Sequence, residues 1–435
     1  MQLRSRLLLY GDLGEDSILD ALCRLWADWE RGDGEVDSLR RRLLDAVKRL
    51  LDLATEYGFD ENLWANYLSF LLMTNENSFS LCRERQGELE GSVNHFARRD
   101  FDLFYQLLHF DFTPLERALE VDCFTVLQSY RAVTKRERCY NHQVSQAVQA
   151  LSRDLMAAKD GGELFDRVTR HYRDVGVGLL GHNRAFRVQE QGTGIMLLPV
   201  HNTEQVKLSD LVGYELQKEQ LRGNVEAFLE GRGANNMLLY GDSGTGKSTS
   251  VKALLNEYHH RGLRVIELYK HQFRLLSAVI GAVKNRNYRF LVFIDDLSFE
   301  ENEVEYKFLK AVIEGGVETR PANLLICATS NRRHLIRETW DDRTDTQFTG
   351  DIHRSDTVEE KLSLSSRFGL QINYSIPKRE LFLEMVEQLA ARRGLTVPRE
   401  ELFAQANRWE LRHGGISGRT AQQFINHLSG HGGGA

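Results

Sequence analysis

The fold is decided by the stretch GDSGTGKSTS, Gly241 to Ser250. Its first four residues resemble the loop around a serine-protease nucleophile, but eight residues together match the phosphate-binding pattern Gly-x-x-x-x-Gly-Lys-Ser. A protease serine also needs a histidine and an acid around it, and the sequence marks none of its scattered histidines for that role. The flanks favour phosphate binding, because NNMLLY (235–240) predicts a buried strand before the loop and STSVKALLNEYHHRG predicts a helix after it.

A strand, a glycine-rich turn and a helix in this order form a cradle for phosphate. Three glycines allow successive backbone N–H groups to point at one anion, and the following helix directs its N-terminal dipole to the same place. Lys247 can then reach the outer phosphates, and the hydroxyl of Ser248 can bind Mg²⁺. The predicted nucleotide-binding residues of the loop are Gly241, Asp242, Ser243, Gly244, Thr245, Gly246, Lys247, Ser248 and Thr249.

Length and composition describe an ordinary globular protein of more than one domain. The chain has 435 residues, of which 42% are hydrophobic and 27% charged. Its formal net charge of -6 gives no general argument for nucleic-acid binding. No apolar run approaches the roughly 20 residues of a membrane helix, and the N-terminus lacks the features of a secretion signal, so we expect neither a membrane span nor export.

The cysteines indicate the redox compartment. They are scattered and contain no C-x-x-C pair, which favours reduced thiols over a disulfide framework or a zinc site. We therefore expect a cytoplasmic protein. The five residues are Cys23, Cys82, Cys123, Cys139 and Cys327.

Residues 1–174 are predicted to form an all-helical N-terminal domain that contacts a client or partner. The segment VDSLRRRLLDAVKRLLDLATEYG, for example, places leucines on one stripe of a helix and charged residues on its other faces. The segment YRAVTKRERCYNHQ is basic and predicts a solvated helix face, with a nucleic-acid contact as the alternative. Its cations are Arg131, Lys135, Arg136 and Arg138.

The remaining chain has a different sequence pattern. Residues 175–204 are Gly-rich and predict a connector with room for a strand or two. In 205–376, five strand runs alternate with helices, and each run carries polar residues near its C-terminal end. This pattern predicts a five-stranded parallel sheet with the ligand site along that edge. Residues 377–430 predict three helices, and 431–435 predict a disordered tail.

Two acids follow the strand run RFLVFI. The strand delivers Asp295 to the sheet edge beside the phosphate loop, where its carboxylate can hold Mg²⁺ through water. Asp296 would face the γ-phosphate and orient or polarise the attacking water. Acids after a strand can also simply cap the next helix, but the placement of this pair after the phosphate loop favours the metal and catalytic roles.

These features together resemble the AAA+ ATPases. The resemblance implies that Leu211, Val212 and Gly213, in LSDLVGYELQKEQL, line the base pocket. It also implies a sensor residue between γ-phosphate and water in LLICATSNRR, an arginine finger for a neighbouring subunit in LSSRFGL, and a second phosphate sensor in SGRTAQQF. The residues in these roles are Asn331, Arg367 and Arg419. The alternatives are a turn cap for the asparagine, a surface ion pair for the first arginine and a solvated helix start for the second.

Three segments carry a closer resemblance. FIDDLSFEE, CATSNRRHLI and EKLSLSSRFGL are similar to the bacterial AAA+ family filed as domain of unknown function 815 (DUF815). This resemblance implies an α/β P-loop core with a C-terminal helical lid at 377–430, a site for ATP and Mg²⁺, and a homo-oligomer formed through Arg367. It implies no settled biological role.

The sequence departs from AAA+ relatives at two points. Many relatives carry Glu where Asp296 stands, so the shorter side chain predicts slow turnover. Protein-unfolding relatives carry an aromatic pore loop where this chain has AVIGAV, so threading of a polypeptide is not indicated. The polar insert 337–361 predicts a partner-facing loop, with a second metal site at its acids and His353 as the weaker alternative.

Two function hypotheses follow. The first is an oligomeric ATPase that uses the ATP cycle to remodel or load a partner, which is an unknown protein or a nucleic acid. The second is an ATP-gated binding switch with little turnover, in one version a nucleic-acid or helicase-loader-like module. The second hypothesis draws on the Asp-Asp pair and on the lack of a pore loop.

Overall fold

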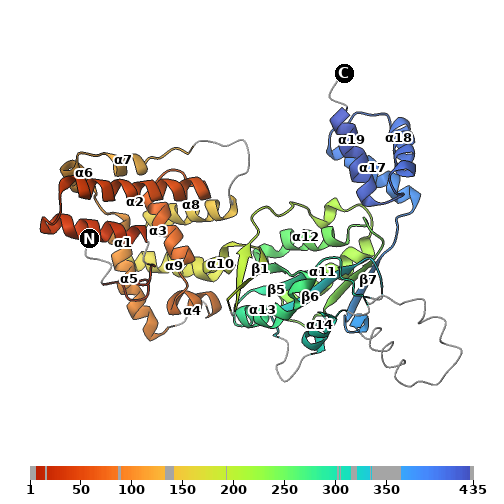
Figure 1. Cartoon of the computed structure of the whole chain (residues 1–435), viewed down its shortest axis with the longest axis horizontal. Helices are drawn as coiled ribbons and strands as arrows, with labels where there is room; N and C mark the ends of the chain where they lie inside the picture. Colours follow the sequence, from red (N-terminus) through yellow and green to blue (C-terminus); the bar gives the residue numbers. More distant parts are fainter. Residues whose placement is uncertain are drawn as a thin grey trace. The chain divides into compact units, whose positions relative to one another are not determined.

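The computed structural model describes residues 6–14, 17–86, 90–132, 142–192, 194–300, 303, 305–314, 321–333, 335 and 364–431. The chain divides into two compact units, Met1–Asn183 and Arg184–Ala435, and we describe each by itself (Figure 1). The basic residues Lys135, Arg136 and Arg138, the insert 337–361 and the tail 432–435 lie outside the described residues. Within the described part, no helix is long and apolar enough to cross a membrane.

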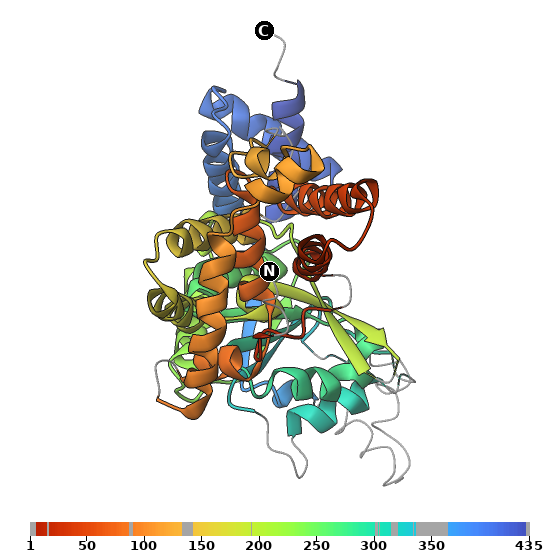
Figure 2. The same cartoon turned by 90° about the vertical axis from the view of Figure 1, so that its left-hand side faces the viewer.

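The described residues of the first unit fold into helices. The one pairing of strand type among them is an isolated bridge between Glu61 and Tyr130. The helices are α1 (Ile18–Arg31), α2 (Val36–Tyr57), α3 (Leu63–Thr74), α4 (Ser78–Gln86), α5 (Ser92–Leu108), α6 (Thr113–Leu119), α7 (Cys123–Leu127), α8 (His142–Met156), α9 (Gly161–Asp174) and α10 (Gly178–His182). In this unit α1 packs against α2, both red in Figures 1 and 2, and α5 packs against α9.

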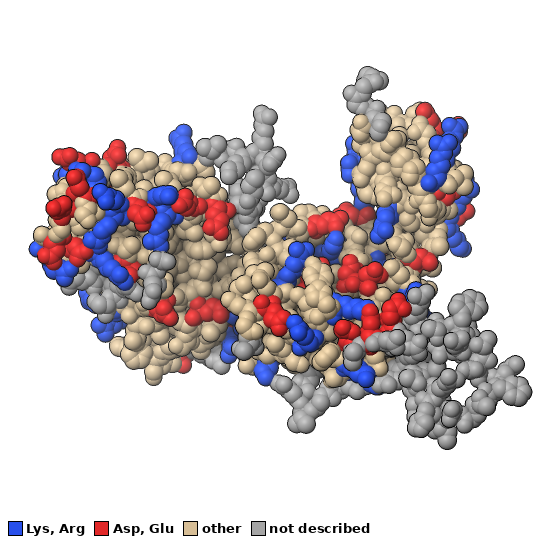
Figure 3. All heavy atoms as spheres, in the orientation of Figure 1, with Lys and Arg blue, Asp and Glu red and all other residues tan. Residues whose placement is uncertain are grey.

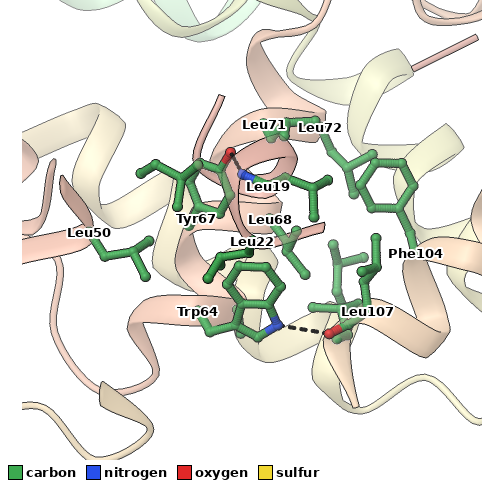
Figure 4. Close-up of a cluster of buried hydrophobic side chains, with 14 of the residues drawn as sticks. Leu19, Leu22, Leu50, Trp64, Tyr67, Leu68, Leu71, Leu72, Phe104 and Leu107 are labelled. Atoms are coloured by element: carbon green, nitrogen blue, oxygen red, sulfur yellow. Dashed lines mark hydrogen bonds between the residues drawn. The ribbon is translucent and has the colours of Figure 1, made fainter. Parts of the chain in front are cut away.

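Leucine and aromatic stripes build the core of this unit. The α2 stripe buries Leu39, Leu43 and Leu50 at helical spacing, and Gly58 ends that helix at φ 68°. Two aromatic residues that carry polar atoms find partners inside the core. The indole of Trp64 donates to the Leu107 carbonyl at 2.7 Å, and the backbone N–H of Leu19 donates to the Tyr67 hydroxyl at 3.0 Å (Figure 4).

A buried acid ties the N-terminal segment to this core. Asp100, on α5, is fully buried, and its carboxylate accepts the backbone N–H groups of Leu8, Leu9 and Tyr10 at 2.8–3.1 Å. The Tyr10 hydroxyl lies 2.8 Å from that of Tyr172, on α9, which in turn donates to the Leu72 carbonyl at 2.7 Å. Residues 8–10 are therefore an integral part of the unit.

The second unit is built on a sheet of seven strands in the order β2-β1-β4-β5-β6-β3-β7. The five predicted strands are all present and all parallel: β3 (Met237–Gly241), β4 (Leu263–Glu267), β5 (Arg289–Ile294), β6 (Leu324–Ser330) and β7 (Leu370–Tyr374). The predicted strand count was wrong, because β1 (Ala185–Gln191) pairs parallel with β4 and β2 (Gly194–Pro199) pairs antiparallel with β1. Both extra strands lie in the predicted connector 175–204.

Helices cover both faces of the sheet. On one face α11 (Glu215–Leu229) and α12 (Lys247–Tyr258) share a core with inward side chains of six strands. The helices α13 (Leu276–Val283) and α14 (Glu305–Glu314) lie on the other side, as Figure 1 shows. Because parallel strands covered on both faces are apolar throughout, β6 has all seven of its residues buried.

Three helices follow the sheet and share a core of their own. They are α17 (Arg379–Arg392), α18 (Arg399–Arg412) and α19 (Gly418–His431), drawn in blue in Figure 1. Phe382, Ala406 and Phe424 are central to this core, and Val212, from the segment before α11, packs into it. A second apolar cluster therefore lies beside the carboxyl ends of the strands.

Candidate nucleotide-binding site

The predicted phosphate loop lies between β3 and α12 and is tightly curled. Its three glycines have positive φ values of 129°, 77° and 97°, at Gly241, Gly244 and Gly246. A Cβ atom at Gly241 would lie 2.2 Å from the Tyr374 carbonyl oxygen, so β7 leaves no room for a side chain there. The loop therefore needs glycine for its backbone conformation and, at this position, for close packing against β7.

Lys247 begins α12 and is 7% exposed. Its ammonium donates to the carbonyls of Gly241 and Asp242 at 2.8 and 2.6 Å and to Asn331 Oδ1 at 3.1 Å. Burial lowers the pKa of Lys247, although the nearby carboxylates of Asp242, Asp296 and Asp295 act against that shift. The ammonium therefore lies at the carboxyl edge of the sheet, inside the loop that would hold phosphate.

Asp295 follows β5 and gathers two hydroxyl groups. Its Oδ1 accepts from Ser248 Oγ at 2.6 Å and from Thr329 Oγ1 at 2.5 Å. The loop serine and the acid predicted to hold Mg²⁺ thus lie in contact. Among the described residues no group of three or more His, Cys, Asp or Glu side chains is placed to hold a metal. The oxygen donors that are present fit Mg²⁺, which is commonly held by one or two protein oxygens together with phosphate and water.

Asp296 has an unusual backbone and a fixed carboxylate. Its φ is 52°, a left-handed value that is uncommon outside glycine. Its N–H donates to Thr329 Oγ1 at 2.9 Å, and its Oδ1 accepts from Asn331 Nδ2 at 2.8 Å. Since Asn331 Oδ1 also accepts from Lys247, the asparagine links the lysine to this carboxylate. Thr329 links the two acids, because one hydroxyl donates to Asp295 and accepts from Asp296.

A pocket of about 760 Å³ opens over these residues. Predicted residues from five segments line it: Leu211, Val212, Ser243, Gly244, Thr245, Gly246, Lys247, Ser248, Thr249, Asp295, Asp296, Asn331 and Arg419. We call this volume the nucleotide pocket. Gly213 does not line it: its φ is 78° and its backbone packs against Leu381, on α17. Gly241 and Asp242 also lie outside the lining.

The start of α19 touches the phosphate loop directly. The backbone N–H of Arg419 donates to the Gly244 carbonyl at 3.2 Å. A Cβ atom at Gly244 would lie 3.0 Å from Ser417 Oγ, and one at Gly418 would lie 3.2 Å from the Gly244 carbonyl oxygen. This close approach of two backbones brings the Arg419 side chain to the pocket wall.

The structure does not bring Arg367 into the pocket. This residue is half-buried in the turn just before β7. Sequence reasoning missed other lining residues: Glu204, Val206, Asp210, Tyr214, Lys252, Thr329, Met385, Leu389, Arg392, Gly418, Gln422 and Gln423. Two of these had a local signal, since Lys252 lies one helical turn after Ser248 and Thr329 lies two strand positions before Asn331. The others come from the segment 204–214 before α11 and from the helices α17 and α19, which packing brings together.

The comparisons with known proteins place the chain in a family. A family model described as "Protein of unknown function (DUF815)" matches residues 181–432, in agreement with the predicted resemblance. Over 211 residues the chain is 28% identical to the replication factor C large subunit of Thermococcus kodakarensis, a match that covers 46% of this chain and 35% of that protein. The chain thus spans about a third of the length of this curated relative.

Solved structures with some similarity include the Thermotoga maritima RuvB Holliday junction branch migration motor. It has a TM-score of 0.35 and 14% identity, over 52% of this chain and 65% of that one. The FIGL-1 AAA domain in complex with ADP has a TM-score of 0.36 and 18% identity, over 52% of this chain and 74% of that one. Likenesses at this level are too distant to bear on the function of this chain.

Proposed function

The chain belongs to the DUF815 family, and from this membership together with the geometry of the nucleotide pocket we propose that it binds ATP with Mg²⁺ and hydrolyses it. The observation that carries the proposal is the linked set Lys247–Asn331–Asp296 beside the pair Ser248–Asp295. Three elements distant in sequence contribute an ammonium, an amide, a hydroxyl and two carboxylates to one pocket wall. This is the donor set that phosphoryl transfer to water needs.

In this proposal the phosphates lie in the loop and the base lies toward Leu211 and Val212. Backbone N–H groups of the loop, Lys247 and Arg419 would bind the phosphate oxygens. Ser248 and Asp295 would hold Mg²⁺, which when bound neutralises charge on the phosphates. The pocket is walled by residues of two subregions, the sheet edge and the helices α17 and α19, so nucleotide would touch both.

Asp296 would orient or polarise the attacking water. Its carboxylate is held by the amide of Asn331, and this bond fixes its direction toward the pocket. Asn331 in turn contacts Lys247, so a phosphate on the lysine and a water on the acid would be aligned by one side chain. Because Asp is one methylene shorter than Glu, the water would be held less firmly and turnover would be slow.

The experiment that tests this proposal compares Lys247→Ala and Asp296→Asn with the unmodified chain. Binding of a fluorescent ATP analogue and release of phosphate are measured separately. Lys247→Ala should weaken binding strongly, whereas Asp296→Asn should bind nucleotide and lose turnover. Equal turnover in Asp296→Asn and the unmodified chain would refute the role of this acid. If the unmodified chain bound no nucleotide, the proposal itself would fail.

We further propose that Arg367 completes the site of a neighbouring copy in a homo-oligomer. This is supported by its place just before β7 and outside its own pocket. A mixing experiment tests it. Arg367→Ala and Lys247→Ala should each be inactive alone, and a mixture should regain activity, because an intact arginine then meets an intact loop. A mixture that stays inactive while the two variants co-assemble would exclude an action between subunits.

The biological task we propose is the remodelling or loading of a partner through the helical region, residues 1–174, with 377–430 acting as a lid. The alternative, a switch that binds a partner in the ATP state with little turnover, draws support from Asp296 in place of Glu. Nucleic acid is the less favoured partner, because acids and bases are interspersed on the face of the helical unit that Figure 3 shows. Within this unit Arg42 pairs with Asp28 and Arg40 with Asp37. Partner capture with Asp296→Asn in ATP, against Lys247→Ala, distinguishes these cases.

A further inference from the structure

The linker from β7 to α17 is held by two residues beside the nucleotide pocket. The backbone N–H of Ile376 donates to Asp242 Oδ2 at 3.0 Å, and the N–H of Asp242 donates to the Tyr374 carbonyl at 3.0 Å. On the other side, the Tyr214 hydroxyl donates to the Ser375 carbonyl at 2.8 Å. We call these three bonds the hinge clasp. Since Ile376 is 57% exposed, polar bonds rather than apolar burial hold this part of the linker.

The backbone carbonyl of Asp242 contacts other residues of the phosphate loop. Its carbonyl accepts from Lys247 Nζ at 2.6 Å and from Thr245 Oγ1 at 2.8 Å. One residue therefore connects the ammonium that would meet the outer phosphates to the linker that leads into α17. The Asp242 carboxylate does not line the pocket, so it is placed to act through the linker and not by touching nucleotide.

The linker leads to helices that carry part of the pocket wall. Met385, Leu389 and Arg392, on α17, line the pocket, and α19 contributes Arg419 and Gln422. Arg392 also donates to the carbonyls of Asp210 and Ser209 at 2.6 and 3.1 Å. A change of angle at residues 375–378 would therefore move these side chains relative to the loop.

From these contacts we infer that Asp242 is a positioning residue that couples occupancy of the phosphate loop to the position of helices α17–α19. This inference rests on the proposed ATP function. Phosphate oxygens compete with the Asp242 carbonyl for the protons of Lys247. When the ammonium turns to phosphate, the Asp242 peptide loses a donor and reorients. The carboxylate of the same residue transmits that movement to the Ile376 amide.

Hydrogen–deuterium exchange of the full chain, with and without MgATP, tests the coupling at the bond itself. In the unmodified chain, ATP should change the exchange of the Ile376 amide and of peptides in α17. In Asp242→Ala that amide should exchange about tenfold faster without nucleotide, because a bond to a carboxylate is lost. The response of α17 to ATP should then largely disappear. Asp242→Asn, which keeps an acceptor oxygen, should restore protection and response.

Kinetics give a second readout that a purely structural role would not produce. We expect Asp242→Ala to lower kcat about tenfold with KM changed less than about threefold, and Asp242→Asn to recover most of kcat. The matched control is Glu387→Gln, on α17, which removes an exposed ion pair with Arg399 and should behave as the unmodified chain.

The possible failures are distinguishable. If the unmodified chain did not bind the fluorescent nucleotide, the proposed function would fall and this inference with it. If it bound and hydrolysed ATP, but Asp242→Ala kept the same kcat and the same response of α17, the inference alone would be overturned. If Asp242→Ala lost hydrogen-exchange protection throughout the chain, Asp242→Asn would decide the question. A fully folded Asp242→Asn variant in which α17 did not respond to ATP would also overturn the inference.

Discussion

Thr329 offers the sharpest test of the proposed site, because its hydroxyl is shared by both acids. We consider Thr329→Val, which keeps the shape of the side chain and removes that hydroxyl. The residue is 1% exposed on a strand whose residues are all buried, where valine is well tolerated. The change should therefore leave the fold in place and act on Asp295 and Asp296.

The magnitude follows from the two bonds lost. The hydroxyl donates to the Asp295 carboxylate at 2.5 Å and accepts the Asp296 N–H at 2.9 Å. A hydrogen bond to a charged group contributes about 1.5–3 kcal/mol. If that free energy orients the acids in the transition state, kcat should fall roughly 10- to 100-fold, at about 1.4 kcal/mol per factor of ten.

The control is Thr329→Ser, which keeps the hydroxyl and removes the buried methyl group. It should retain most of kcat and lose about 1 kcal/mol of unfolding free energy. Steady-state phosphate release gives kcat and KM, and urea unfolding gives stability. The reasoning would be refuted if the valine variant kept full turnover, or if the serine variant lost as much turnover as the valine variant.

Three further changes have defined outcomes. Gly244→Ala should weaken binding of the fluorescent ATP analogue at least about tenfold in a titration, since φ is 77° and the new methyl would crowd Ser417. Asp100→Ala should destabilise the helical unit by about 3 kcal/mol in urea unfolding, because three backbone N–H groups lose their acceptor. Burial lowers the pKa of His171 from 6.5 to about 4, so the unfolded chain binds the extra proton first as the pH falls. The contribution of His171 to the free energy of unfolding should be fully present above about pH 6.5 and fall by about 3 kcal/mol between pH 6.5 and 4. His171→Phe should flatten this decline, and an unchanged dependence of stability on pH would contradict the role of His171.

The parts of the site that the sequence could predict are those whose residues are adjacent in the chain or follow a strand. The loop around Lys247 is a local motif between a strand and a helix, so its cradle could be read directly. Asp295 and Asn331 could be placed together because both follow parallel strands, whose carboxyl ends meet at one sheet edge. The action of Arg367 on a neighbouring copy stays a prediction, because it depends on a second chain.

The parts that could not be predicted depend on packing. Thr329 lies inside an apolar run, and a single hydroxyl there is typical of core residues. Arg392 reaches the pocket only because α17 packs over the segment before α11, which no spacing in the sequence reveals. The connector left room for β1 and β2, but their place in the sheet was not predicted, because most of their side chains are exposed or half-buried and they lack the apolar run of a central strand.

The bonds that hold residues 8–10 also constrain how the chain folds as it is made. Tyr10 leaves the ribosome 162 positions before Tyr172, the partner of its hydroxyl, and some 90 positions before Asp100. At about 5–20 residues per second, this interval is on the order of ten seconds. During that time residues 8–10 lack the full set of partners that they have in the folded unit. The helical unit can therefore close only near the end of its own synthesis, and pausing of translation before α9 would prolong exposure of its aromatic core.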